Sequence, residues 1–191
     1  MKHGIDRGAL ILVVGPSGSG KDTLIDAAKS ALSGNPRFHF PRREITRPAE
    51  AGGEDHIPID TETFETRRDG GSYALAWGAH GLFYGVPGVI ADILEGGTSV
   101  VVNVSRSVID EARSRFPPTA VVTLSVPEDV LRARLSARGR ESAEQIEARV
   151  ARAAAVPVGG ANVFAVVNDG TIDYAVDRFL EALRQADTLT A

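Results

Sequence analysis

The architecture of this chain follows from one segment, Ala9-Leu10-Ile11-Leu12-Val13-Val14-Gly15-Pro16-Ser17-Gly18-Ser19-Gly20-Lys21-Asp22-Thr23. An apolar run leads into a glycine-rich turn with one lysine, and residues 24–29 continue at helical spacing. The glycines of the turn allow a tight bend whose backbone N–H groups point inward, and the helix that follows adds the positive end of its dipole. The segment therefore predicts a strand, an anion-binding loop and a helix.

The spacing within the loop indicates which anion it holds. Gly15 and Lys21 fit the pattern G-x-x-x-x-G-K, in which the lysine reaches the outer phosphates of a nucleoside triphosphate as a point charge. An ordinary glycine turn with a surface lysine is the alternative, which the position of the pattern between strand and helix disfavours. We therefore assign ATP binding to Gly15, Pro16, Ser17, Gly18, Ser19, Gly20, Lys21, Asp22 and Thr23.

One position departs from the usual loop pattern. The residue after the lysine is commonly a Ser or Thr whose hydroxyl binds Mg2+, whereas here it is Asp22, followed by Thr23. Asp22 either faces the metal, directly or through water, or acts mainly on the N-terminus of the helix, where a carboxylate is favourable. Both roles fit the sequence, and Asp22 is the candidate metal ligand.

Composition and charge narrow the classes of protein that fit. A chain of 191 residues with 43% hydrophobic and 24% charged residues suits one globular domain over residues 1–191. A formal net charge of -4 gives no sign of a nucleic-acid-binding surface. The sequence has no cysteine, no secretory signal and no apolar run of about 18 or more residues. We therefore expect no disulfide, no membrane partner and a cytoplasmic location.

Apolar runs alternate with helical patterns along the chain, which predicts the α/β class with a parallel-sheet core flanked by helices. After the first strand, the main strands are expected in segments 98–104, 119–126 and 163–167. Helices are expected in segments 24–33, 61–68, 87–95, 108–116, 127–135 and 172–186. Together with the phosphate loop, this order predicts a P-loop NTPase fold.

An insertion of about residues 40–86 is expected to form a flap that carries an arginine cluster. The cluster consists of Arg42, Arg43 and Arg47. A solvated basic loop is the simpler explanation of this cluster taken alone. A small hairpin with aromatic residues completes the flap, and its Trp77 and His80 are expected to be structural rather than catalytic.

A second insertion, of about residues 136–146, has the features of a hinged lid. A helix breaks there at a glycine flanked by arginines, and Ser142 is expected to cap the next helix. A phosphate loop with arginines on two separate flaps indicates phosphoryl transfer, in which catalysis is mostly placement and charge neutralisation. The arginines that would close over the transferred group are Arg138, Arg140, Arg149 and Arg152. Those that would hold an anionic acceptor are Arg42, Arg43 and Arg47.

No catalytic base is evident near either arginine cluster. An acceptor that is already an ionised phosphate needs no proton removed, whereas a hydroxyl acceptor usually does. The sequence therefore favours a kinase that phosphorylates a phosphate group. Polar residues in Asn103-Val104-Ser105-Arg106 follow a predicted central strand, where ligands of open α/β sheets usually bind.

Over essentially its whole length, the chain resembles the guanylate kinase group of nucleoside monophosphate kinases. The resemblance rests on the loop Gly15 to Lys21, Thr46-Arg47-Pro48, Phe83-Tyr84-Gly85, Arg134-Leu135-Ser136-Ala137-Arg138-Gly139 and Val167-Asn168-Asp169. It implies that the Thr-Arg region and the Tyr-Gly hairpin hold the acceptor phosphate, that the Arg-Gly flap is the lid, and that the late Asn-Asp turn lies near adenine. The implied ligands are Arg47 and Tyr84 for the acceptor, Arg138, Arg140 and Arg149 for phosphates, and Asn168 and Asp169 for ATP.

The departures from guanylate kinases concern recognition of the base. Guanylate kinases use acidic side chains to accept hydrogen bonds from guanine, but the matching hairpin stretch here is Leu75-Ala76-Trp77. After the central strand, where that group has two aspartates, this chain has Asn103 and Ser105, followed by Arg106. Guanine would lose its partners, and unpaired polar edges in a closed site reject a substrate strongly. The residues present suit an acceptor with more phosphate and no base.

This combination resembles the ribose 1,5-bisphosphate phosphokinases, the guanylate-kinase-like enzymes of phosphonate breakdown. Further matches are Gly20-Lys21-Asp22, Glu54-Asp55-His56-Ile57, Gly81-Leu82-Phe83-Tyr84-Gly85-Val86 and Arg138-Gly139-Arg140-Glu141. The resemblance implies transfer of the γ-phosphoryl group of ATP to ribose 1,5-bisphosphate, giving 5-phosphoribosyl 1-diphosphate and ADP, with Mg2+ bridging the nucleotide phosphates. The implied catalytic residues are Lys21, Arg138, Arg140 and Arg149, and the implied sugar-phosphate ligands are Arg43, Arg47, Tyr84, Asn103, Ser105 and Arg106.

Two other functions fit part of the pattern. A nucleoside monophosphate kinase with altered base contacts is the alternative among enzymes. A noncatalytic binding module on the same fold is the alternative from another class, but such modules commonly lose the phosphate loop, which is intact here from Gly15 to Lys21. The expected partners are therefore ATP and a small sugar phosphate.

Overall fold

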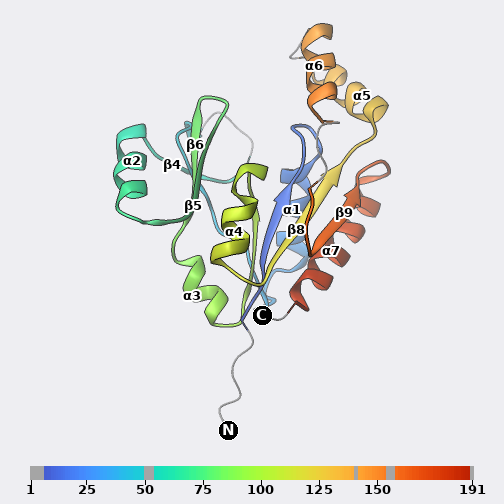
Figure 1. The fold of residues 1–191 in the computed structure, drawn as a ribbon. Helices are drawn as coiled ribbons and strands as arrows, with labels where there is room; N and C mark the ends of the chain where they lie inside the picture. The colour runs from blue at the N-terminus through green and yellow to red at the C-terminus, as the bar shows by residue number, and fades with distance from the viewer. Residues whose placement is uncertain (1–6, 50–53, 140–141, 154–157, 190–191) are drawn as a thin grey trace.

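A five-stranded parallel sheet forms the centre of the structure, which is a computed structural model (Figure 1). The described residues are 7–49, 54–139, 142–153 and 158–189, and of Arg138, Arg152 and Ala153 only the backbone is described. The strands are β1 (Leu10–Val14), β2 (Phe38–His39), β7 (Ser99–Asn103), β8 (Thr119–Ser125) and β9 (Val163–Val167). Their order is β2-β7-β1-β8-β9, and every neighbouring pair runs parallel. The predicted α/β fold with a parallel core is therefore confirmed.

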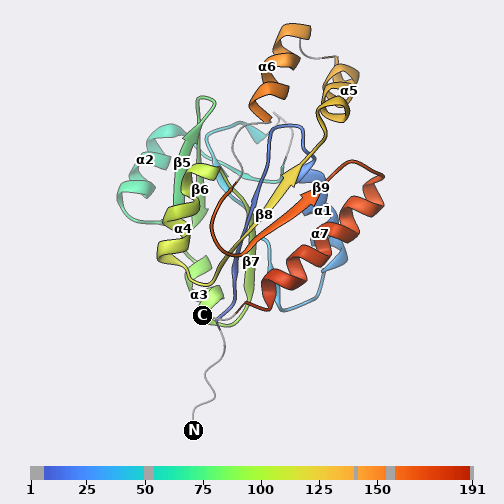
Figure 2. The same cartoon turned by 45° about the vertical axis from the view of Figure 1, so that its right-hand side comes forward.

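Different helices cover the two faces of this sheet. Along β1, Ile11 and Val13 face helices α1 (Lys21–Ala31) and α7 (Ile172–Asp187). Leu10 and Leu12 face the other side, where α3 (Ile90–Glu95) and α4 (Ile109–Arg115) pack. Figure 2 separates the two layers, with α1 and α7 on one side of the strands and α3 and α4 on the other. β1 is fully buried because both faces of a parallel sheet are covered in this way.

A second sheet and one helix form a small lobe, residues 44–87 without the undescribed 50–53. Its strands are β3 (Glu44–Ile45), β4 (Ile57–Pro58), β5 (Tyr73–Ala79) and β6 (Leu82–Pro87), in the order β4-β3-β6-β5. Helix α2 (Thr61–Asp69) covers one face, where the ring of Phe64 lies 5.0 Å from that of Tyr73 and 5.2 Å from that of Phe83. Because side chains alternate across a strand, Tyr84 lies on the face opposite to Phe83, and its partner Trp77 lies there too. A register shift between Tyr73 and Leu75 allows Tyr73 and Trp77 of the same strand to lie on different faces.

A buried carboxylate joins three elements of the small lobe. Glu44 of β3 accepts hydrogen bonds from Tyr73 Oη of β5 at 2.5 Å and from Arg67 Nη1 of α2. Burial and the hydrogen bond to Glu44 raise the pKa of the Tyr73 phenol, which therefore stays protonated and donates. The charge of Glu44 is thus both paired and hydrogen-bonded, as a buried carboxylate requires.

Helices α5 (Glu128–Arg138) and α6 (Ala143–Ala153) form a pair with a hydrophobic core of its own, made of Leu131, Leu135, Ile146 and Val150. α5 ends at Gly139, whose φ of 61° is the left-handed conformation that glycine adopts readily. The N–H of Ser142 donates to Gln145 Oε1 at 2.9 Å, and the N–H of Gln145 donates to Ser142 Oγ at 3.3 Å. The predicted cap at Ser142 is therefore confirmed as a capping box.

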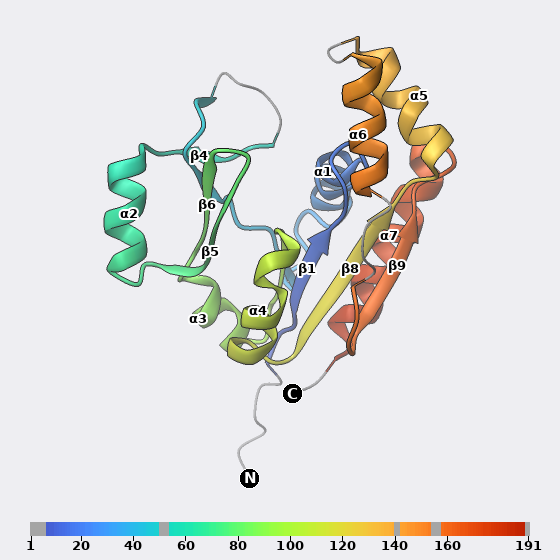
Figure 3. The same ribbon diagram turned by 45° about the horizontal axis from the view of Figure 1, so that its top comes forward.

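The small lobe and the α5–α6 pair lie on opposite sides of the carboxyl end of β1 (Figure 3). None of the helices in the described part of the chain combines the length and the apolar character needed to span a bilayer.

One element differs from the sequence prediction: Pro87 ends β6, opposite Tyr73, and α3 begins only at Ile90. The N–H of Gly88 donates to Ser72 O at 2.8 Å, which holds the chain beside the hairpin past Pro87.

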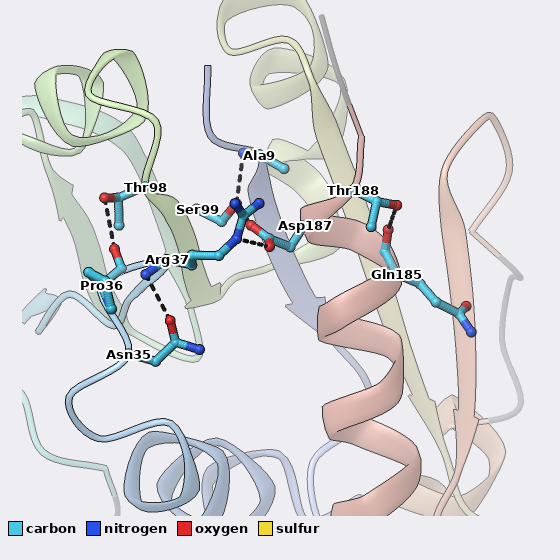
Figure 4. A network of polar contacts seen from close by, with 9 residues as sticks. All are labelled: Ala9, Asn35, Pro36, Arg37, Thr98, Ser99, Gln185, Asp187 and Thr188. Atoms are coloured by element: carbon cyan, nitrogen blue, oxygen red, sulfur yellow. Dashed lines mark hydrogen bonds and ion pairs between the residues drawn. The ribbon is translucent and has the colours of Figure 1, made fainter. Parts of the chain in front are cut away.

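A polar network ties the amino ends of the strands to the end of the last helix (Figure 4). Ser99, at the start of β7, is fully buried, and its Oγ accepts from the N–H of Ala9 at 3.0 Å and donates to Asp187 at 2.7 Å. Asp187 also accepts from Arg37 Nε at 2.6 Å. The network therefore holds together the amino-terminal end of the sheet, which lies opposite the end that carries the phosphate loop.

We expect Ser99→Ala to lower the free energy of unfolding by about 1–3 kcal/mol, because it leaves the buried N–H of Ala9 without an acceptor. The matched control is Thr98→Ala. Thr98 Oγ1 donates to Pro36 O at 3.1 Å in an exposed setting, so we expect a loss of about 0.5 kcal/mol or less. Urea denaturation followed by circular dichroism measures both, and equal losses would contradict a role for burial.

Candidate functional site

The phosphate loop joins β1 to α1 at the carboxyl end of the parallel sheet, where ligands of such sheets bind. Gly20 precedes α1, and no described side chain caps this helix, so its first N–H groups remain available to an anion. Lys21 Nζ donates to Gly15 O at 2.7 Å and to Pro16 O at 2.9 Å. The ammonium group is therefore held against the loop, beside the N–H groups that the helix offers.

Two glycines of the loop are required by close contacts. A Cβ atom at residue 15 would lie 2.7 Å from the carbonyl oxygen of Leu124 in β8. Gly20 has a φ of 87°, and a Cβ atom there would lie 2.7 Å from Asn168 Nδ2. The loop is thus pressed between β8 and the turn after β9, which explains why two positions of the motif tolerate no side chain.

Asn168 supports the loop from behind. Asn168 is only 3% exposed. Its Nδ2 donates to Ser19 O at 2.9 Å, and its Oδ1 accepts from Arg134 Nη2 of α5 at 3.3 Å. The sequence prediction gave Asn168 and Asp169 to ATP, whereas the carboxamide of Asn168 contacts the loop and α5 in this structure. Asp169, the next residue, is exposed.

Asn168→Ala is expected to destabilise the protein by about 1–3 kcal/mol, because the buried carbonyl of Ser19 loses its donor. The same change should weaken ATP binding, since the loop then lacks the side chain that supports it behind Gly20. Urea denaturation and calorimetry with ATP measure the two effects. Asp169→Ala is the control for stability, and as an exposed substitution it should cost about 0.5 kcal/mol or less; an equal cost would contradict the supporting role of Asn168.

The charge state of Lys21 depends on its surroundings. Burial lowers its pKa from the ordinary value of 10.5 to about 8. The carboxylate of Asp22 opposes this shift, whereas the guanidinium groups of Arg43 and Arg106 add to it. Three cations of the site therefore already repel one another, and a bound polyanion would relieve that repulsion.

We expect the affinity for ATP to fall as the pH rises through about 8, by up to about tenfold per pH unit, because Lys21 must be protonated to bind phosphate. The sign follows from the shift: the ammonium form is dominant below the lowered pKa and is lost above it. Calorimetry between about pH 7.5 and 9.5 measures the effect. Lys21→Arg should abolish it because arginine stays charged, and Lys29→Arg should retain it; a flat profile in the parent protein would contradict the assignment.

A cavity of about 820 Å³ lies in front of the loop. Its wall includes the hairpin of the small lobe, the residues that follow β7, and α6. The predicted site residues found in this wall are Gly15, Pro16, Ser17, Gly18, Gly20, Lys21, Asp22, Thr23, Arg43, Arg47, Tyr84, Asn103, Ser105, Arg106 and Arg149. The fold thus brings together residues that are far apart in the sequence, in a volume typical of small-molecule sites.

Arg43 forms the centre of the small-lobe side of the cavity. The rings of Trp77 and Tyr84 lie nearly parallel, at 4°, with centroids 5.4 Å apart. Arg43 Cζ lies 5.4 Å from the Trp77 ring centre and 5.1 Å from that of Tyr84. Its Nε and Nη2 donate to the two carboxylate oxygens of Glu54 at 3.1 and 2.5 Å. The guanidinium is therefore fixed from two directions.

Arg47 is positioned by a buried histidine. His56 is 4% exposed, and its Nε2 lies 3.0 Å from Arg47 O, a group that only accepts hydrogen bonds. Its Nδ1 lies 2.9 Å from Glu54 O and 3.3 Å from Arg47 Nη2. Arg47 Nε is buried and has no hydrogen-bond partner among the described residues. The imidazole thus connects the two segments that carry Arg47 and Glu54.

The residues that follow β7 face the start of α1. Asn103 Nδ2 donates to Asp22 Oδ1 at 3.2 Å, and Ser105 accepts from the N–H of Ser107 at 3.3 Å at the start of η2 (Arg106–Val108). No group of three or more His, Asp or Glu side chains in the described residues could hold a metal by itself. A single carboxylate beside a phosphate loop fits Mg2+ nonetheless, because this ion is commonly held by one or two carboxylates together with substrate phosphates and water.

The α5–α6 pair contributes one described arginine to the cavity. Arg149 of α6 donates through Nη2 to Ser17 Oγ of the phosphate loop. Of the other lid arginines that the sequence predicts, Arg140 lies outside the described residues, and Arg138 and Arg152 are described only along the backbone. A direct contact therefore joins α6 to the phosphate loop.

Among the polar and aromatic residues of the cavity wall, Glu54, Trp77 and His80 were not assigned a ligand-binding role from the sequence. His80 has a φ of 53° at the tip of the hairpin, a conformation uncommon for a residue with a side chain. Arg42 departs in the opposite way, because it does not line this cavity: its Nη2 donates to His56 O at 2.8 Å and its Nε pairs with Asp55 at 3.0 Å. It lies beside a smaller cavity of about 50 Å³, which Arg43 and Glu54 also line. Position in the sequence alone did not separate Arg42 from Arg43.

The fold and the cavity define a class of protein. A phosphate loop after the central strand of a parallel sheet, opposite a small arginine-bearing lobe, is the arrangement of guanylate-kinase-like P-loop kinases. A family model for the P-loop containing region of the AAA domain matches residues 2–41. Guanylate kinase from Anaplasma phagocytophilum superposes with a TM-score of 0.63, covering 97% of this chain and 89% of that chain at 19% identity. This likeness is one of fold.

Sequence relatives narrow the class to a family. Ribose 1,5-bisphosphate phosphokinase PhnN of Brucella melitensis is 43% identical over 185 residues, covering 97% of this chain and 96% of that protein. The protein of the same name from Agrobacterium fabrum is 42% identical over 177 residues, covering 93% of this chain and 97% of that protein. The chain belongs to the ribose 1,5-bisphosphate phosphokinase PhnN family.

Proposed function

We propose that this protein transfers the γ-phosphoryl group of ATP to the 1-phosphate of ribose 1,5-bisphosphate. An oxygen of the 1-phosphate forms a bond to the γ-phosphorus, and the bond from that phosphorus to the β,γ-bridging oxygen breaks. The electron pair of the broken bond stays with ADP, and the product is 5-phospho-α-D-ribose 1-diphosphate. No proton has to leave the acceptor, because a phosphate monoester is already ionised at neutral pH.

One observation carries this proposal beyond family membership: the phosphate loop and the arginines of the small lobe line the same cavity. Lys21 and the first N–H groups of α1 would hold the triphosphate, while Arg43, Arg47 and Arg106 would hold the sugar phosphates. In such a reaction the protein contributes placement and charge neutralisation rather than covalent chemistry. Both donor and acceptor are polyanions, so cations on the two sides of one cavity serve both needs.

We propose that Asp22 holds Mg2+ beside the triphosphate, directly or through water. The ion would neutralise charge on the β- and γ-phosphates when it is bound with the nucleotide. The hydrogen bond from Asn103 to Asp22 would orient the carboxylate for this task. Thr23, which is exposed in the same cavity wall, would be the neighbouring hydroxyl ligand of the nucleotide.

We propose that the α5–α6 pair is the lid over the transferred phosphoryl group. Arg149 contacts Ser17 of the loop and would move onto the phosphates when they occupy it. Arg138, the last residue of α5, and Arg140 are proposed to reach the same group. Closure of such a lid excludes water and completes the set of cations around the reaction.

In an assay that couples ADP formation to a colour change, we expect ribose 1,5-bisphosphate to be phosphorylated at least about 100-fold more efficiently than GMP, measured as kcat/KM. The physical reason for this preference is that, among the described residues, the small-lobe side of the cavity has only one acid, Glu54, which is already paired with Arg43. The alternative function, a nucleoside monophosphate kinase, predicts the reverse order. Robust turnover of GMP with none of ribose 1,5-bisphosphate would therefore contradict the proposal.

Lys21→Ala is the control for the same assay. Its turnover should fall about 100-fold or more, because a cation aimed at the transferred phosphate is removed. Calorimetry with ATP separates the enzyme from a noncatalytic module: the parent protein should bind ATP, and the variant should bind it weakly. A parent protein without ATP binding would favour the module.

A further inference from the structure

The small lobe carries an aromatic surface that is already covered. The rings of Trp77 and Tyr84 are stacked with nearly parallel planes and both line the cavity wall, and an aromatic ring in such a wall is the kind of group on which a nucleobase stacks. Arg43 lies over both rings and is itself only 8% exposed. The guanidinium therefore occupies the position that a planar ligand would take.

The small lobe also carries an acid, but its oxygens are engaged. Two carboxylates occur in the cavity wall, Asp22 beside the phosphate loop and Glu54 on the side of the small lobe. Both oxygens of Glu54 accept from Arg43, and the two side chains are 9% and 17% exposed. A carboxylate tied in this way has one acceptor site taken on each oxygen and its charge neutralised, so it is a poorer partner for the N–H groups of a base edge.

Arg43 keeps donors for another ligand. A guanidinium has five N–H groups, of which Glu54 takes one on Nε and one on Nη2. The remaining edge, formed by Nη1 and Nη2, has the fork geometry that matches phosphate oxygens. The flat faces of the group are used for ring contact and its free edge for anion binding.

We infer that the Arg43–Glu54 pair determines acceptor specificity: it closes the aromatic surface of Trp77 and Tyr84 to a nucleobase and offers a donor edge to a phosphate. This inference rests on the proposed function, because it concerns the acceptor side of the same cavity. A base can enter only if Arg43 leaves the rings and Glu54 at once, which separates a nearly buried ion pair. A phosphate needs no such rearrangement.

Removal of Arg43 should therefore change two properties in opposite directions. The aromatic pair becomes open for stacking, and the Glu54 carboxylate becomes free to accept hydrogen bonds from N–H donors such as those of guanine. At the same time the acceptor phosphate loses a charged donor. Loss of catalysis alone is what any damage to the site would cause, whereas a gain of base binding is specific to this arrangement.

The experiment measures GMP binding by calorimetry with the phosphate loop saturated by a non-hydrolysable ATP analogue. For Arg43→Ala we expect GMP to bind at least about tenfold more tightly than to the parent protein. The kcat/KM for ribose 1,5-bisphosphate should fall about 100-fold in the same variant. Arg68→Ala is the matched control, because Arg68 of α2 pairs with Asp69 on the exposed surface and lies outside the large cavity, and it should change neither quantity.

A loss of turnover without a gain in GMP binding would overturn the inference and leave Arg43 as a phosphate ligand only. Unchanged turnover in Arg43→Ala would overturn it as well. Binding of the ATP analogue reports whether each variant is folded. Should Arg43→Ala fail that check, Arg43→Lys takes its place, because lysine keeps the charge but lacks the planar fork; it should gain GMP affinity to a smaller degree, and no gain would overturn the inference.

Failure of the proposed function gives a different result from failure of this inference. A parent protein that does not phosphorylate ribose 1,5-bisphosphate contradicts the proposed function. The comparison of GMP binding between the parent and Arg43→Ala does not depend on the identity of the natural acceptor. The two conclusions are therefore tested separately in one set of proteins.

Discussion

The contact between the Asn168 carboxamide and the Ser19 carbonyl holds the phosphate loop in the shape on which the rest of the site depends. The loop has β8 on one side, against Gly15, and Asn168 on the other, against Gly20. Backbone N–H groups bind an anion well only if they already point at it, because reorientation during binding would cost part of the binding energy. The parallel sheet matters for function chiefly because it places β8 and Asn168 in contact with the two sides of the loop.

The small lobe solves a different problem, which is the placement of flexible cations. Arg43 is paired with Glu54, Arg47 lies against His56, and Arg67 is paired with Glu44. Burying such pairs has a desolvation cost that their attraction offsets only in part, so they are poorly explained by stability alone. The contacts of Arg43 and Arg47 do restrict the side-chain rotamers of two arginines that line the cavity. A site for polyanions gains from cations that are already in position before the ligand arrives.

The accuracy of sequence-based reasoning varied with the kind of feature. The phosphate loop, the parallel core and the cap at Ser142 depend on short stretches of chain, and all three are confirmed by the structure. Pro87 was assigned to a helix because proline often opens one, but a hydrogen bond from Gly88 to Ser72 keeps it at the end of a strand. Arg42 and Arg43 show the main limit: the charge pattern placed both in one basic cluster, although only Arg43 lines the large cavity.

The sequence by itself determined the α/β class, the phosphate loop with Lys21, and the absence of acids from the hairpin stretch Leu75-Ala76-Trp77, because each of these is written in neighbouring residues. Only the tertiary structure decided that Asn168 stands behind the loop, that Arg43 covers Trp77 and Tyr84, and that Glu54 neutralises it. These contacts join residues from separate strands and turns. Their formation depends on strand order and on the direction in which each side chain leaves its strand, which no local pattern specifies.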